Sequence, residues 1–287
     1  MDFRAILMGL AFAALWSSAF TSARMIVAEA PPLAALSLRF LISGGLGVAI
    51  ALALGQSWRL NRAQWRATLI FGLCQNALYL GLNFVAMQTV EASLASIIAS
   101  SMPLMVAGLG WIVFRDRVRP LGLIGLLAGV AGVAIIMGAR LSDGVDAFGV
   151  TLCLIGALAL TIATLSVRGA SSGGNVMMIV GLQMFVGAAV LAVASVATEE
   201  IVVHWSPRLI AAFTYTTLAP GLLATWIWFR LVGRIGAIKA ATFHFLNPFF
   251  GVAIAAAVLG ERLGALDVVG VVVIAAGILA VQISKQA

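Results

Sequence analysis

Three polar residues, Asn76, Tyr79 and Asn83, interrupt a run of apolar residues at spacings of three and four. At these spacings the side chains lie on one face of a helix. Amide and phenol groups donate and accept hydrogen bonds without carrying charge at neutral pH, so this face can bind a polar solute. Polar groups are costly in an apolar environment unless they face protein or water. We expect this face to line a polar cavity.

Five other apolar runs carry polar or aromatic residues that can complete the wall of such a cavity. Some of them have a second interpretation, because serines permit close helix packing and a single histidine is more often a hydrogen-bonded packing residue than a proton carrier. The candidate substrate-binding residues are Trp16, Ser17, Phe20, Asn76, Tyr79, Asn83, Ser96, Thr161, Thr164, Trp226, His244 and Asn247.

Charged residues are nearly absent from the apolar runs. No Asp or Glu lies at the middle of a run, although proton- or drug-coupled antiporters commonly use a buried carboxylate. Proton coupling would have to use His244 or the substrate itself, and facilitative transport is the alternative. Arg39 lies six residues into the second run, where snorkelling to the outer surface or pairing with a backbone carbonyl is favoured over substrate binding.

Signals of enzymatic chemistry are missing. The sequence has neither a G-x-S-x-G motif nor an H-E-x-x-H motif. The segment Gly233–Lys239 is not a phosphate-binding loop, because its spacing is wrong and Ala240 replaces the required hydroxyl. Cys74 and Cys153 lie within apolar runs and are expected to pack there. We therefore predict no catalytic residue, no metal site, no cofactor and no enzymatic activity.

The elements that position these residues are transmembrane helices. The chain of 287 residues is 63% hydrophobic and 9% charged, whereas soluble domains contain about 25% charged residues. A span needs about 20 mostly apolar residues. Ten runs meet this requirement, at residues 5–27, 33–54, 67–87, 92–114, 121–139, 147–167, 176–197, 209–231, 237–259 and 266–283.

Positive charge predicts the orientation of the spans. Twelve of the 17 Lys and Arg residues fall on the side of the N-terminus, four fall on the other side, and Arg39 lies inside the second run. Lys and Arg accumulate on the cytoplasmic side of membrane proteins. We therefore expect both termini to be cytoplasmic, and we attribute the net charge of +7 to orientation in the bilayer rather than to a nucleic-acid partner.

The chain contains an internal repeat with an offset of 145 residues. Residues 92–132 match residues 237–277, and Pro103 falls on Pro248, Asp116 on Glu261 and Arg117 on Arg262. This predicts two five-helix repeats, residues 1–140 and 141–287. Because five is an odd number, the second repeat enters the membrane inverted, with a central cavity between the halves.

Matched prolines and a glycine-rich helix face predict where helices bend and where they pack closely. Pro103 and Pro248 predict matched bends, which mark either a binding site or a packing kink. The glycine face of the fifth run permits close contact between helices, either within the bundle or between two copies in a homodimer. This face consists of Gly122, Gly125, Gly129 and Gly132.

Each repeat contains a proline that is followed 13 residues later by an acid and an arginine: Pro103 with Asp116 and Arg117, and Pro248 with Glu261 and Arg262. These two units and the glycine-spaced spans after them resemble the drug/metabolite transporter superfamily in its ten-span, EamA-type branch. Within this branch the chain resembles the YddG-type amino acid exporters in particular. The first unit departs from the usual pattern, with Arg115-Asp116 where Gly-Glu is expected. The resemblance implies an inner-membrane exporter of amino acids or related metabolites that works by alternating access without ATP. A drug or cation exporter and a nucleotide-sugar carrier of the same fold are the alternatives.

Overall fold

The structure is a bundle of membrane-spanning helices. A computed structural model of the protein describes residues 3–115, 119–142, 144–166, 173–262 and 264–286. In these residues the chain forms no strand, and ten helical spans are long and apolar enough to cross a membrane. The predicted all-α membrane protein with ten spans is confirmed.

Six of the ten spans are single helices. They are α1 (Phe3–Val27), α2 (Pro32–Ala53), α7 (Pro120–Ser142), α8 (Ala147–Ser166), α9 (Val176–Thr198) and α14 (Ala265–Gln286). The other four spans are divided into shorter segments: α3 (Arg62–Phe71), η1 (Gly72–Leu80) and α4 (Gly81–Ala86); α5 (Ala92–Ser100) and α6 (Met102–Phe114); α10 (Pro207–Thr216), η2 (Thr217–Leu223) and α11 (Ala224–Ile235); and α12 (Ala237–Thr242), η3 (Phe243–Leu246) and α13 (Asn247–Leu259).

The irregular segments occur at matching places in the two halves. The π-helices η1 and η2 begin at Gly72 and Thr217, which are 145 residues apart. The helices α6 and α13 begin at Met102 and Asn247, which are also 145 residues apart. The repeat in the sequence is therefore a repeat of helix breaks as well as of residue types.

The packing of the spans follows the same repeat. The second spans of the two halves, α2 and α9, pack along each other, as do the fifth spans, α7 and α14. The first span, α1, contacts the eighth span through α10 and α11 and the ninth span through α13. Its counterpart α8 contacts the third span through η1 and α4 and the fourth span through α5 and α6. The first span of each half therefore packs on the third and fourth spans of the other half, as expected of two inverted repeats.

The third and eighth spans begin after polar capping residues that precede their predicted apolar runs. The third span begins at Arg62, where the Asn61 side chain accepts a hydrogen bond from the Gln64 amide and the Gln64 side chain accepts one from Asn61 N–H. The eighth span begins at Pro207, after the Ser206 side chain accepts from the Leu209 amide. These polar caps satisfy the first free N–H groups of a helix, so the helices extend beyond the apolar run.

The helices α6 and α13 end at equivalent positions with different residues. Gly260 ends α13 with φ 70°, and Arg115 ends α6 with φ 54°. A left-handed conformation is unfavourable for residues with a Cβ atom, so the departure from Gly in the first repeat introduces local strain. The Asp116 and Arg117 of this motif lie outside the described residues.

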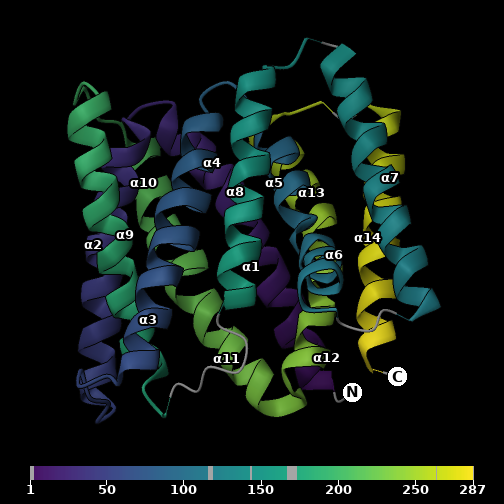
Figure 1. The fold of residues 1–287 in the computed structure, drawn as a ribbon. Coiled ribbons are helices and arrows are strands. Elements are labelled where there is room, and N and C mark those ends of the chain that lie inside the picture. Colours follow the sequence, from purple (N-terminus) through teal and green to yellow (C-terminus); the bar gives the residue numbers. More distant parts are fainter. Residues whose placement is uncertain (1–2, 116–118, 143, 167–172, 263, 287) are drawn as a thin grey trace.

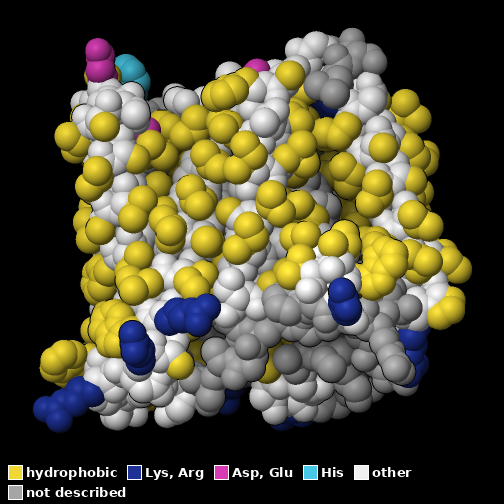
Figure 2. Space-filling model, viewed as in Figure 1, with side chains coloured by type: hydrophobic (Ala, Val, Ile, Leu, Met, Phe, Trp, Pro, Cys, Tyr) yellow, Lys and Arg dark blue, Asp and Glu magenta, His cyan; other side chains and the backbone are white. Residues whose placement is uncertain are grey.

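The surface has the distribution expected of a protein in a bilayer. Hydrophobic side chains cover the middle of the visible face, and most visible Lys and Arg side chains lie at the lower end (Figure 2). Both chain termini lie at this same end of the bundle (Figure 1).

The glycine face of α7 packs within the bundle. A Cβ atom at Gly125 would lie 2.7 Å from the Gly277 carbonyl oxygen, and one at Gly132 would lie 3.0 Å from the Gly270 carbonyl oxygen. These glycines thus let α7 and α14 approach each other closely. A homodimer through this face would require the two helices to separate.

Candidate functional site

A small cavity lies inside the bundle and is lined by both halves of the chain. Its volume is about 80 Å³. Its wall combines α1, α2, η1 and α4 of the first half with α9, α10, η2 and α11 of the second. Both π-helices contribute to this wall, and π-helical turns often occur at functional sites.

A second cavity of about 20 Å³ adjoins the first. Trp16, Phe20 and Tyr79 line both cavities. The wall of the smaller cavity also includes Pro103 and Asn247, near the breaks in the fourth and ninth spans. The two volumes therefore form one central site with an aromatic boundary between them.

Eight of the twelve candidate residues line this central site. They come from the first, third and ninth spans: Trp16, Ser17, Phe20, Asn76, Tyr79, Asn83, His244 and Asn247. The predicted proline positions are equivalent in the structure, because Pro103 and Pro248 each lie in the first turn of the helix after a break.

The three asparagines are held by hydrogen bonds through their amide nitrogens. Asn76 Nδ2 donates to the Gln183 carbonyl at 2.9 Å, and Asn83 Nδ2 donates to the Tyr79 carbonyl at 2.7 Å. Asn247 Nδ2 lies 2.9 Å from His244 Nδ1. The Oδ1 atoms of Asn83 and Asn247 are buried without a hydrogen-bond partner among the described residues.

His244 lies among aromatic rings. Its ring centroid is 5.4 Å from that of Phe12 and 5.3 Å from that of Trp228. Because Asn247 Nδ2 is a donor, His244 Nδ1 acts as the acceptor in their contact. This arrangement agrees with the interpretation of His244 as a hydrogen-bonded packing residue.

Four candidate residues do not line the central site. Ser96 is buried at the contact with Gly251, while the hydroxyls of Thr161 and Thr164 donate to the carbonyls of Ala157 and Leu160 in their own helix. Such return bonds are common for Thr in helices.

Trp226 is also outside the site. It is 52% exposed, with the Arg230 guanidinium 5.1 Å from its ring centroid. A half-exposed tryptophan beside a cation is typical of a residue at the edge of the bilayer.

Arg39 is the main functional candidate that sequence reasoning did not favour. Its side chain neither snorkels to the surface nor pairs with a carbonyl in the described part of the chain; it is 6% exposed and lines the larger cavity. The feature of the sequence that could have identified Arg39 was a charged residue within an apolar run. A charge in a run does not show whether that face of α2 points toward the cavity or toward lipid.

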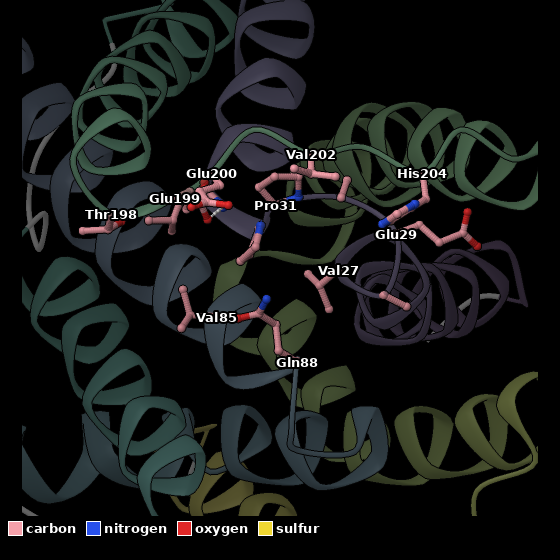
Figure 3. Close-up of a pocket in the computed structure, with 14 residues that line it drawn as sticks. Val27, Glu29, Pro31, Val85, Gln88, Thr198, Glu199, Glu200, Val202 and His204 are labelled. Carbon is pink, nitrogen blue, oxygen red and sulfur yellow. Dashed lines mark hydrogen bonds between the residues drawn. The ribbon is translucent and has the colours of Figure 1, made fainter.

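A wider pocket opens at the end of the bundle where α1 ends. It has a volume of about 500 Å³, and Figure 3 shows Glu199 and Glu200 on one side of it and Glu29 and His204 on the other. Glu199 is already engaged, because its two oxygens accept from the amides of Leu33 and Ala34 at 2.7 and 2.9 Å.

None of the candidate residues lines this outer pocket. Its residues Val27, Val85 and Gln88 lie shortly after Ala23, Phe84 and Met87 of the central cavity along the same parts of the chain. The pocket, called the vestibule below, therefore lies beside one end of the central site, and its Glu199 accepts from the first amides of α2.

Comparison with known proteins places these features in context. A model described as the EamA-like transporter family matches residues 3–138 and 147–282. The uncharacterized transporter YvbV of Bacillus subtilis (strain 168) is 26% identical over 274 residues, covering 95% of this chain and 90% of that protein.

Two other relatives have more informative names. The uncharacterized inner membrane transporter YedA of Escherichia coli (strain K12) is 28% identical over 275 residues, covering 94% of this chain and 88% of that protein. The aromatic amino acid exporter YddG of Ancylobacter novellus is 29% identical over 136 residues, which cover 47% of each chain.

Proposed function

Because the chain belongs to the EamA-like transporter family of drug/metabolite transporters, we propose that it exports amino acids or related small metabolites from the cytoplasm by alternating access. It is a multi-pass membrane transporter and not an enzyme. The two repeats, residues 1–140 and 141–287, would move relative to each other around the central cavity, so that the cavity opens to each side of the membrane in turn.

The observation that carries this proposal is the central cavity between the two halves. Its wall is formed near matched helix breaks, and it contains polar atoms without partners in the described part of the chain. Irregular helices are tolerated at membrane depth where they line a cavity, and transporters with inverted repeats bind their substrates at such places.

The charge of the cavity wall disfavours a nucleotide sugar. A nucleotide sugar would need several cations for its phosphates, and Arg39 is the single Lys or Arg in the walls of the two central cavities as described. The similarity to an aromatic amino acid exporter supports amino acids as the class to test.

The location that we propose is a bacterial inner membrane with both termini in the cytoplasm. The relative YedA is named as an inner membrane transporter. The uneven distribution of Lys and Arg supports this orientation. The wide vestibule of Figure 3 would then face the periplasm.

Counterflow in proteoliposomes tests this function. Vesicles that contain purified protein and unlabelled amino acid are diluted into labelled amino acid, with and without a pH gradient. We expect accumulation of neutral amino acids without a gradient, because the spans contain no mid-membrane carboxylate. Flux of a cationic dye or a nucleotide sugar in the absence of amino acid flux would contradict the proposal.

A further inference from the structure

Arg39 brings a positive charge into the central cavity without a negative charge to balance it. The residue is 6% exposed and lines the cavity, whose described wall contains no Asp or Glu. Among the described residues both ion pairs involve Arg140 instead. Arg39 Nε is buried and has no hydrogen-bond partner in the described part of the structure.

The surroundings hold the guanidinium in place without neutralising it. Its central carbon lies 5.4 Å from the centroid of the Phe40 ring. On the opposite half of the chain, a Cβ atom at Gly221 would lie 3.4 Å from Arg39 Nη2, so the guanidinium lies beside the backbone of η2. An unpaired buried ion costs several kcal/mol, and such a residue in a span indicates a functional site.

One residue of the cavity wall has an acceptor without a donor among the described residues. Asn83 lines the cavity, its Oδ1 is buried without a hydrogen-bond partner in the described part of the chain, and its Nδ2 donates to the Tyr79 carbonyl. Ammonium groups have three donors and no acceptor, so this oxygen suits a protonated amine. A cation and an unpaired acceptor in one small cavity match the two charged groups of a zwitterion.

The remainder of the wall is aromatic. Trp16, Phe20 and Tyr79 lie where the two cavities meet, and the smaller cavity continues toward His244. No carboxylate lines either cavity as described, so a cationic side chain would find no partner there. The wall therefore suits an uncharged, preferably aromatic, side chain.

We propose that Arg39 binds the carboxylate of the transported solute while Asn83 accepts from its ammonium group. The substrate class is then an α-amino acid with an uncharged side chain, recognised as a zwitterion. This inference rests on the proposed function and specifies its ligand. A guanidinium can hold a carboxylate through two parallel hydrogen bonds, which explains an arginine at a position where an unpaired charge is costly.

The test measures which analogues compete with labelled phenylalanine in counterflow. Phenylethylamine and phenylalaninamide lack the carboxylate, and 3-phenylpropionate lacks the ammonium group. We expect phenylalanine to compete at least about ten-fold better than either amine, as is reasonable for loss of a charge-assisted pair. Arg39→Gln should abolish this preference, and Arg39→Lys should keep part of it, because Lys retains the charge but not the fork geometry.

Arg24→Gln is the matched control. Arg24 is partly buried in α1 and donates to the Met87 carbonyl, but it does not line either central cavity. This variant should keep the preference for the carboxylate. Each variant is first checked for a single elution peak and an unchanged melting temperature in detergent, so that a folding defect is recognised.

Each outcome has a distinct meaning. If wild-type protein transports phenylalanine but both amines compete equally well, or if Arg39→Gln keeps the preference, the assignment of Arg39 is wrong while the proposed function stands. Arg39-dependent transport of 3-phenylpropionate without transport of phenylalanine would retain the carboxylate site and overturn the amino acid. If the wild-type protein transports neither compound but another amino acid gives counterflow, this inference is overturned and the proposed function stands. If no amino acid gives counterflow, both are overturned.

Discussion

Two arginines within the bundle, Arg39 and Arg140, have opposite surroundings. Arg140, near the end of α7, donates to Glu91 at 2.7 Å and to both carboxylate oxygens of Asp267 at 2.8 and 3.0 Å. Arg39 lies in the central cavity without a carboxylate partner among the described residues. The charge of Arg140 is thus balanced by two carboxylates, whereas no carboxylate balances the charge of Arg39 in the described wall of its cavity.

The difference separates structural charges from ligand-binding charges. Arg140 joins the fifth span to the loop before α5 and to the tenth span, and nearby Glu261 accepts from the Ala92 and Ser93 amides at the start of α5. These contacts connect the two repeats at one end of the bundle. The cavity around Arg39 makes no comparable connection, so its charge is available to a solute.

The largest predicted effect is on stability, from Arg140→Met. This change leaves Asp267, whose side chain is 4% exposed, without its partner. We expect a loss of about 3 kcal/mol of unfolding free energy, because breaking a buried ion pair leaves an uncompensated charge. The Glu91 contact contributes less, since that side chain is 37% exposed.

The measurement is thermal unfolding in detergent, with Arg39→Met as the control. Arg39→Met removes a buried charge and leaves no carboxylate unpaired, so its melting temperature should be equal to or above that of the wild type. If Arg39→Met destabilised the protein more than Arg140→Met, Arg39 would be a structural residue and the distinction would fail.

The next effect is on transport, from Met184→Glu. Met184 lies 145 residues after Arg39, at the equivalent position of the second repeat, and lines the same cavity. A carboxylate there would compete with the solute for Arg39 and make the cavity resemble the surroundings of Arg140. We expect counterflow of neutral amino acids to fall by about ten-fold or more, the loss expected when a charge-assisted bond is displaced.

Met184→Gln is the control because it has a similar size and no charge. It should keep transport within about five-fold of the wild type, since one neutral hydrogen bond is worth about 1 kcal/mol. Equal losses in the two variants would mean that packing against α2, rather than charge, makes the position sensitive.

The smallest effect concerns the neutral wall of the site. Asn83→Ala removes the unpaired Oδ1 and should weaken the competition by phenylalanine about five-fold, as expected for one hydrogen bond, while competition by 3-phenylpropionate stays unchanged. Trp226→Ala, on the outer surface, should alter neither. Equal sensitivity of the two competitors to Asn83→Ala would contradict contact of Asn83 with the ammonium group.

Much of the architecture could be predicted because it depends on local composition. Long apolar runs specify spans whatever surrounds them, and the 145-residue repeat specifies two equivalent halves. The polar face of the third span was also within reach, because Asn76, Tyr79 and Asn83 are expensive to expose to lipid. All three line the central cavity.

The orientation of individual side chains was decided by tertiary structure. The spans are apolar on all sides, so periodicity does not mark which face of a helix points inward. The π-helix η2 adds a further difficulty, because one extra residue rotates the following helix by about 100°. Trp226, which was expected to line the site, lies after η2 and is 52% exposed.

Arg39 illustrates the same limit. The sequence by itself determined that a cation enters the second span, but the cost of that charge is equally well avoided by snorkelling, by pairing or by a ligand. In the folded protein α2 packs against α9, and Gly221 of η2 lies beside the guanidinium at the cavity. Those contacts join residues more than a hundred positions apart, and spacing along the chain carries no record of them.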